Sequence, residues 1–246
     1  MIYRASDFVF EPNPQVARAR RVLIKPSAAY PLPYPVTTSR ETMAAIIRGI
    51  RRVSEADILI LEGTCQPESV RSIYRGLGYD FPRVISLDVN DCILVEVENP
   101  LTKPFALANF WVPNIVLSCD YLITVSPFKV VAGQAELTIA NLLGLLPSSK
   151  YGEASGKGSG QLQRLGINSV IADLYFTLPF DLGIVDARMK FYTGADPTKG
   201  EIEEYGYIMV GEPFEVDNEA MKATGTNADY MNLISMAKVE IESIGK

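Results

Sequence analysis

The sequence contains no histidine. This absence excludes Ser-His and Cys-His nucleophilic catalysis, imidazole ligation of a metal ion, and a histidine that acts as general acid or base. Carboxylates, lysines, hydroxyl groups and backbone atoms must therefore perform whatever chemistry the protein carries out.

Cysteine is scarce as well. The three cysteines are Cys65, Cys92 and Cys119, and no two of them have the spacing of a zinc-binding or redox motif. An odd number of isolated cysteines is typical of free thiols in a reducing compartment. We therefore expect a cytoplasmic protein without an iron–sulfur cluster.

An excess of basic charge and long apolar runs are also missing. The formal net charge of −6 argues against a nucleic-acid partner. The longest uncharged stretch, residues 104–119, is too short to span a bilayer, and the N-terminus lacks the basic and apolar regions of a signal peptide. We expect no membrane partner, and a homo-oligomer is an open alternative.

Apolar runs closed by turn residues predict strands at Arg21–Pro26, Asp57–Leu61, Arg83–Leu87, Cys92–Val97, Tyr121–Val125, Leu182–Val185 and residues 207–211. Helical spacing predicts helices near residues 39–53, 67–77, 161–176, 215–224 and 228–243, with a helix or long turn at 137–146. A capping box that begins at Thr38 is expected to start the first helix.

Strands that alternate with helices predict an α/β fold with a mostly parallel, possibly mixed, sheet and helices on both faces. We expect a single domain over residues 1–246, with the Cys92–Val97 and 207–211 strands antiparallel at an edge. Residues 148–160 hold four glycines and four serines. They predict a flexible loop within the domain, whose glycines allow it to close over a ligand.

Ionisable residues follow five of the predicted strands. They are Lys25, Glu62, Asp88, Lys129 and Asp186. If the strands are parallel, these side chains converge at the edge of the sheet where α/β proteins bind ligands. The alternative is that they only mark the places where strands meet solvent.

Two lysines and three carboxylates limit the chemistry of such a site. Lysines suit an anionic group, and carboxylates without histidine favour a hard divalent cation such as Mg²⁺, Mn²⁺ or Ca²⁺. A desolvated lysine can also act as a base or form a Schiff base. The glycines at 152–158 do not fit a P-loop, because Gly152 and Gly156 are too close and Gly158 follows Lys157. The tyrosines of residues 30–34 are candidates to line a pocket.

Several segments, taken in order, resemble the bacterial and archaeal family named domain of unknown function 362 (DUF362). The matching residues are Lys25-Pro26, Thr37-Thr38, Glu62-Gly63, Asp88, then Lys129, Thr138, Asn141 and Gly144 in the central segment, and Lys150, Asp186, Gly194 and Asp217 after it. The resemblance covers nearly the whole chain.

This chain departs from the family pattern in two places. Family members usually carry a histidine two residues after the central lysine, where this chain has Val131. Many also carry ferredoxin-like cysteine clusters, which this chain lacks. A more distant likeness to the N-terminal domain of nickel-dependent lactate racemases is not carried over to function, because the histidines that chemistry requires are absent.

Residues and resemblance together favour an enzyme that acts on a small carboxylate or phosphate. Lys129, Asp186 and Asp88 are the candidate catalytic residues, the aspartates as acid–base groups or ligands of a divalent cation. The candidate ligand-binding residues are Lys25, Thr37, Thr38, Glu62, Gly63, Thr138, Asn141, Gly144, Lys150, Gly194 and Asp217. One alternative is a non-catalytic binding or carrier module for a small molecule, cofactor or metal. Another is a structural subunit whose strand-end residues only form ion pairs.

Overall fold

A central mixed sheet organises the computed structural model, which describes residues 1–64, 69–152, 161–194 and 196–244. Its strand order is β1-β10-β9-β7-β2-β3-β4, and β8 pairs with β7. The bounds are β1 Ile2–Arg4, β2 Arg21–Pro26, β3 Asp57–Glu62, β4 Val84–Asp88, β7 Tyr121–Val131, β8 Gln134–Glu136, β9 Leu182–Thr193 and β10 Gly200–Gly211. Strands β4, β3, β2, β7 and β9 run parallel, and β10, β1 and β8 are antiparallel to their neighbours. The predicted α/β fold is confirmed.

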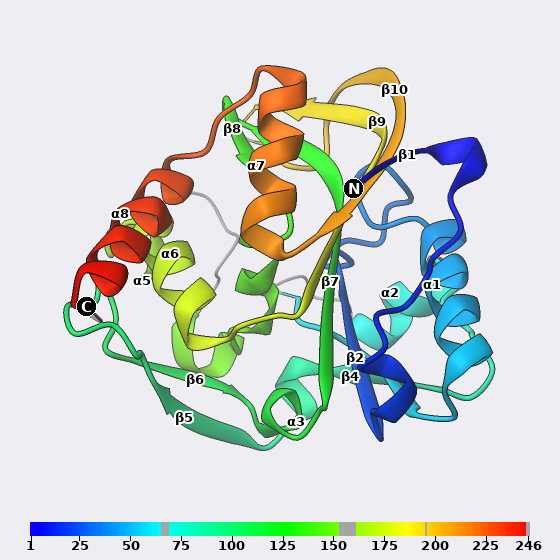
Figure 1. Ribbon diagram of the computed structural model, residues 1–246, viewed down its shortest axis with the longest axis horizontal. Coiled ribbons are helices and arrows are strands. Elements are labelled where there is room, and N and C mark those ends of the chain that lie inside the picture. Colours follow the sequence, from blue (N-terminus) through cyan, green and yellow to red (C-terminus); the bar gives the residue numbers. More distant parts are fainter. Residues whose placement is uncertain (65–68, 153–160, 195, 245–246) are drawn as a thin grey trace.

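Helices cover both faces of this sheet (Figure 1). Helices α1 (Arg40–Val53) and α2 (Val70–Gly76) lie on one side, and α6 (Ile167–Thr177), α7 (Pro213–Thr224) and α8 (Asp229–Ile244) on the other. Short helical segments connect the main elements: η1 Ala5–Asp7, η2 Val16–Arg18, η3 Val89–Asp91, α3 Asn114–Leu117, η4 Ala140–Leu145, α4 Ser148–Tyr151 and α5 Gln161–Arg164. Among the described residues, no helix combines the length and apolar character that crossing a membrane requires.

The inner strands are apolar on both faces because both are covered. Val22 and Ile58 pack with α1 in one core cluster, whereas Leu23 and Leu59 pack on the opposite face in a cluster that includes Leu174 of α6. Alternate residues of a strand point to opposite faces, so a continuous apolar run is what a doubly covered strand requires.

The predicted Cys92–Val97 strand does not join the main sheet. It is β5 (Leu94–Glu98), which pairs with β6 (Asn109–Pro113) in a separate two-stranded antiparallel sheet. Phe110 and Val112 of β6 belong to the same core cluster as Leu23. This burial holds the two-stranded β5–β6 sheet, the β5–β6 ribbon, against the face of the main sheet. The local sequence pattern of β5 does not reveal that its partner is β6.

Strands β7 and β9 continue well past the predicted ends at Val125 and Val185, and β10 begins at Gly200, seven residues before the predicted strand. Polar residues such as Lys129 and Asp186 stand inside these strands. Their buried polar partners, described below, allow the strands to continue through positions that resemble strand ends in the sequence.

Three other local predictions need correction. Ser39, not Thr38, caps α1, because its Oγ accepts a hydrogen bond from the Thr42 N–H at 3.0 Å. The predicted helix at 161–176 is interrupted before α6 by Gly166, whose φ of +85° is left-handed. The predicted loop at 148–160 begins with helix α4, and residues 153–160 lie outside the described part of the chain.

Candidate functional site

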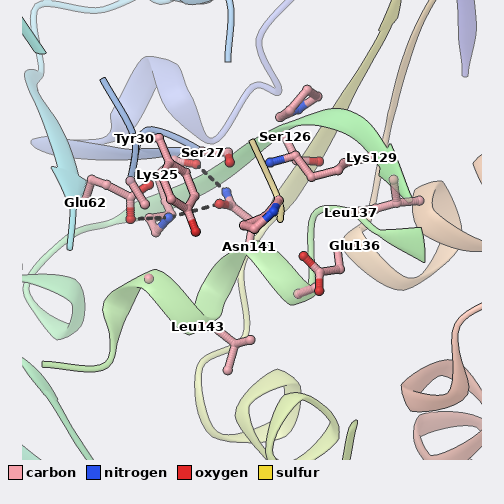
Figure 2. Close-up of a pocket in the computed structure, with 15 residues that line it drawn as sticks. Lys25, Ser27, Tyr30, Glu62, Ser126, Lys129, Glu136, Leu137, Asn141 and Leu143 are labelled. Carbon is pink, nitrogen blue, oxygen red and sulfur yellow. Dashed lines mark hydrogen bonds and ion pairs between the residues drawn. The ribbon is translucent and has the colours of Figure 1, made fainter. Parts of the chain in front are cut away.

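A cavity of about 140 Å³ opens at the carboxyl ends of β2 and β3 and beside the middle of β7. Its polar walls come from Lys25, Ser27, Tyr30, Glu62, Ser126, Lys129, Glu136 and Asn141 (Figure 2). Its apolar walls come from Ala29, Pro127, Leu137, Ala140, Leu143, Gly144 and Pro197. The segment after β2, the η4 turn and β7 therefore meet around this cavity.

Lys25 and Glu62 form a buried ion pair on one side of the cavity. The Lys25 Nζ lies 2.8 Å from Glu62 Oε1, and it donates to the Pro26 carbonyl at 2.8 Å and to Asn141 Oδ1 at 3.0 Å. An ammonium group has three hydrogens, so all three have acceptors within the protein. Burial lowers the pKa of Lys25, and the neighbouring Glu62 opposes this shift.

Glu62 and Asn141 tie the surrounding segments to this pair. Glu62 accepts hydrogen bonds from the backbone N–H of Ala28 at 2.7 Å and of Gly63 at 2.9 Å. The Asn141 Nδ2 donates to the carbonyl of Lys25 and to Thr124 Oγ1, both at 3.1 Å. The ion pair therefore fixes η4 against β2 and β7.

Two glycines of the family pattern allow this close approach. A Cβ added at Gly144 would lie 2.2 Å from Glu62 Oε1 and 2.8 Å from Lys25 Nζ, and one added at Gly63 would lie 2.5 Å from the Gly144 carbonyl oxygen. Neither position has room for a side chain. The Glu62-Gly63 turn and the segment Asn141–Gly144 therefore pack in direct contact, and each needs a glycine at the point of contact.

Lys129 occupies the other side of the cavity and is bound differently. Its side chain comes from β7 and donates one hydrogen bond, to the Val36 carbonyl at 2.9 Å, and its Nζ lies 6.0 Å from the centre of the Tyr30 ring. The residue is only 7% exposed. Burial lowers the pKa of Lys129, and the charges of Glu136 and Glu62 oppose this shift. Two of its three ammonium hydrogens have no acceptor among the described residues.

Ser126 is a site residue that the sequence analysis missed, as it also missed Ser27 and Glu136. Ser126 is 2% exposed, and its Oγ has no hydrogen-bond partner in the part of the chain that the structure describes. Buried hydroxyl groups nearly always have a partner, so this one is available to a ligand. A signal was present: a serine directly follows the apolar run of the strand that was predicted to end at Val125.

Asp186 lies away from the cavity, beneath the start of α1. It accepts hydrogen bonds from Ser39 at 3.1 Å and Thr42 at 2.6 Å, and Arg188 binds both of its carboxylate oxygens, at 2.8 and 2.9 Å. The Arg188 guanidinium stacks on the Tyr34 ring at 4.8 Å. These contacts hold the segment after β2 against β9.

Asp88 and Asp217 also bind the backbone outside the cavity. Asp88 accepts from the N–H of Asn90 at 2.9 Å and of Val70 at 3.4 Å, at the starts of η3 and α2. Asp217 accepts from the N–H groups of Thr138 and Ile139, each at 3.0 Å, and from Thr138 Oγ1 at 2.6 Å. Burial raises the pKa of Asp217 to about 7.

The other sequence-predicted residues are spread around the site. Thr37 donates to the Leu32 carbonyl at 2.6 Å and Thr38 to that of Val125 at 2.9 Å, so both shape the segment after β2. Lys150 is exposed and lies over the Trp111 ring at 4.0 Å. A Cβ at Gly194 would meet only open space.

The structure thus brings Lys25, Glu62, Lys129, Asn141 and Gly144 together around one cavity. It places Asp88, Asp186 and Asp217 elsewhere. Within the described ranges, no three cysteine or acidic side chains are grouped to hold a metal ion.

The family model described as domain of unknown function (DUF362) matches residues 22–222. The chain belongs to the DUF362 family. This match confirms the resemblance drawn from the sequence motifs. The matched range includes every residue that lines the cavity. The family histidine position, Val131, is the last residue of β7 and does not line the cavity.

Comparison with solved structures gives a distant similarity to the lactate racemase apoprotein from Thermoanaerobacterium thermosaccharolyticum. The TM-score is 0.52 at 12% sequence identity, and the alignment covers 89% of this chain and 53% of that protein. The DUF362 chain therefore spans about half the length of the racemase and shares its fold. None of the curated proteins matches this chain.

Proposed function

We propose that this DUF362 protein is an enzyme that binds a small carboxylate or phosphate in the cavity and acts on it there. One observation carries the proposal: Lys129 and Ser126 face the same cavity with donor groups that the described protein atoms do not use. A buried ammonium with open donors favours an anion, because the anion supplies both charge and acceptors.

The two lysines have separate roles in this proposal. Lys25 already has three acceptors and a carboxylate partner, so it shapes the cavity and contributes little net charge. Lys129 has no carboxylate within 4.0 Å among the described residues and supplies the attraction for an anion. Asp88 and Asp186 support the surrounding backbone and do not contact the ligand.

The size of the cavity limits the ligand. A volume of about 140 Å³ is well below the roughly 300–1,000 Å³ of sites for drug-sized molecules. Leu137 and Leu143 add apolar surface beside the donors. We propose a ligand of a few non-hydrogen atoms with one anionic group and a short carbon skeleton.

The Lys129→Met variant tests the anion site. Titration calorimetry with acetate and with inorganic phosphate should show at least a tenfold loss of affinity, equivalent to about 1.4 kcal/mol. Methionine keeps the apolar stem and removes the charge, so the fold should survive. Ser126→Ala should weaken binding to a smaller extent, because it removes one neutral donor.

The matched control is Lys222→Met on the exposed surface of α7, which should bind both anions as the wild type does. Unchanged affinity in Lys129→Met would contradict the proposal. Anion capture without turnover of any small acid would reduce the function to that of a binding module.

A further inference from the structure

We infer that Lys129 is also a nucleophile, and that the substrates are small oxo acids whose carbonyl carbon forms an imine with its Nζ. This inference rests on the proposed function and names the substrate class of the same site. It follows from a comparison of the two cavity lysines, the free hydroxyl of Ser126 and the size of the cavity.

The two lysines differ in the property that a nucleophile needs. Attack on a carbonyl requires a neutral amine with a free lone pair. Lys25 is held as an ammonium by the Glu62 carboxylate at 2.8 Å and by two further acceptors. Lys129 has a single backbone acceptor, Val36, and so can lose a proton without breaking an ion pair among the described residues.

Burial favours the neutral form of Lys129, and the two carboxylates that face it oppose this effect from beyond ion-pair distance. Glu136 lies opposite it in the β7–β8 register and Glu62 lies across the cavity, but neither comes within ion-pair distance of its Nζ. Burial lowers the pKa of Lys129 against the influence of both carboxylates.

The reaction needs no oxidant or reductant. The Nζ lone pair attacks the carbonyl carbon, a C–N bond forms, and the C=O π electrons move to oxygen. A proton passes from nitrogen to that oxygen to give a carbinolamine. The carbinolamine hydroxyl takes a second proton from solvent and leaves as water, which gives the iminium. The Ser126 hydroxyl, buried and without a partner, is placed to donate to the carbinolamine oxygen or to the carboxylate.

One lysine can both attract the acid and react with it. The ammonium form draws the carboxylate into the cavity, and the neutral form attacks. The iminium restores the positive charge directly beside the carboxylate of a 2-oxo acid. The positive charge on Nζ therefore keeps a carboxylate partner in the product. An iminium formed from a simple aldehyde would lack this partner.

Borohydride trapping tests the inference on the wild-type protein. Incubation with pyruvate and sodium borohydride should add one N-carboxyethyl group, and peptide mapping should place it on Lys129. Lys129→Arg should lose the label, because a guanidinium group does not form the imine. Ser126→Ala should slow labelling. Lys222→Arg should be labelled at Lys129 as the wild type is.

The outcomes separate this inference from the proposed function. Acetate binding without a label on Lys129 would overturn the imine and leave the anion site intact. A label spread equally over Lys129 and exposed lysines such as Lys222 would also overturn it. If wild-type protein binds neither acetate nor phosphate and takes up no label, both proposals fail. Peptide mapping of the wild type keeps the test decisive even if a variant does not fold.

Discussion

At the scale of single residues, some buried polar groups of the cavity have hydrogen-bond partners within the protein, and others lack them among the described residues. Lys25, Glu62 and Asn141 use their donors and acceptors on one another and on the backbone. Lys129 and Ser126, on the same cavity, do not. A protein keeps a buried polar group without a partner at a cost of about 1–3 kcal/mol, which is a reason to assign such groups to a ligand.

Gly144→Ala should destabilise the protein by at least about 2 kcal/mol. The added Cβ would lie 2.2 Å from Glu62 Oε1, and this carboxylate cannot move without breaking the ion pair with Lys25. Urea unfolding followed by circular dichroism measures the loss.

The control for this prediction is Gly76→Ala at the end of α2, where a Cβ meets nothing within 4 Å. That variant should keep its stability or gain up to about 1 kcal/mol. Equal stability of Gly144→Ala and the wild type would show that the Lys25–Glu62 pair tolerates displacement.

At the scale of elements, the site combines residues of strands β2, β3 and β7 with short irregular segments that pack beside them. The η4 turn supplies Asn141 and Leu143, and Asp217 of α7 binds the backbone just before it. The segment after β2 is held at Thr38 by Val125 and at Tyr34 by β9. The part of the cavity wall outside the strands is therefore held in position by buried side chains from other elements.

The stability contribution of Asp217 should fall as pH rises from about 4 to about 7, and then stay level. Burial raises the pKa of this carboxyl from the ordinary value of 3.8 to about 7. Between these values the folded protein binds a proton that the unfolded chain releases, so raising the pH favours unfolding, by at most about 1.4 kcal/mol per pH unit.

Comparison with Asp217→Asn isolates this effect, because the variant keeps every other titratable group. The difference in unfolding free energy between wild type and variant should be larger at about pH 5 than at about pH 7. A difference that is constant with pH, or that grows toward pH 7, would contradict the prediction.

At the scale of the whole molecule, the main sheet and the β5–β6 ribbon share one core. Phe110 and Val112 of the ribbon pack in the same cluster as Leu23 and Leu59 of the central strands. The Asp173 carboxylate of α6 accepts hydrogen bonds from the backbone N–H groups of residues 105–107, at 2.7–2.9 Å. We expect the ribbon and the sheet to unfold together.

Trp111 is the only tryptophan and lies in β6, so its fluorescence reports on the ribbon. Urea unfolding followed by this fluorescence and by far-ultraviolet circular dichroism should give the same midpoint, as a single cooperative domain requires. A fluorescence transition at clearly lower urea would show that the ribbon is a separate unit.

The sequence by itself determined the α/β class, the parallel strands β2, β3 and β4, and helix α1, because local apolar periodicity is enough to specify a doubly covered strand or an amphipathic helix. It also predicted that Lys25, Glu62 and Lys129 lie close together; the structure places all three around one cavity, with Lys129 inside β7 and not at its end. The family motifs added Asn141 and Gly144, and the structure gives the physical reason for both.

Only the tertiary structure decided which ionisable residues share the cavity. Asp88 and Asp186 satisfy the same strand-end pattern as the lysines, and Asp217 came from the family motifs, but each is bound to a backbone segment or side chain outside the cavity. The sequence pattern did not identify Ser126 as a site residue, because β7 continues past Val125 only through its pairing with β8 and β9. The length of a strand and the hydrogen-bond partners of a buried side chain depend on residues that are distant in the sequence. The apolar periodicity of a segment does not identify those residues.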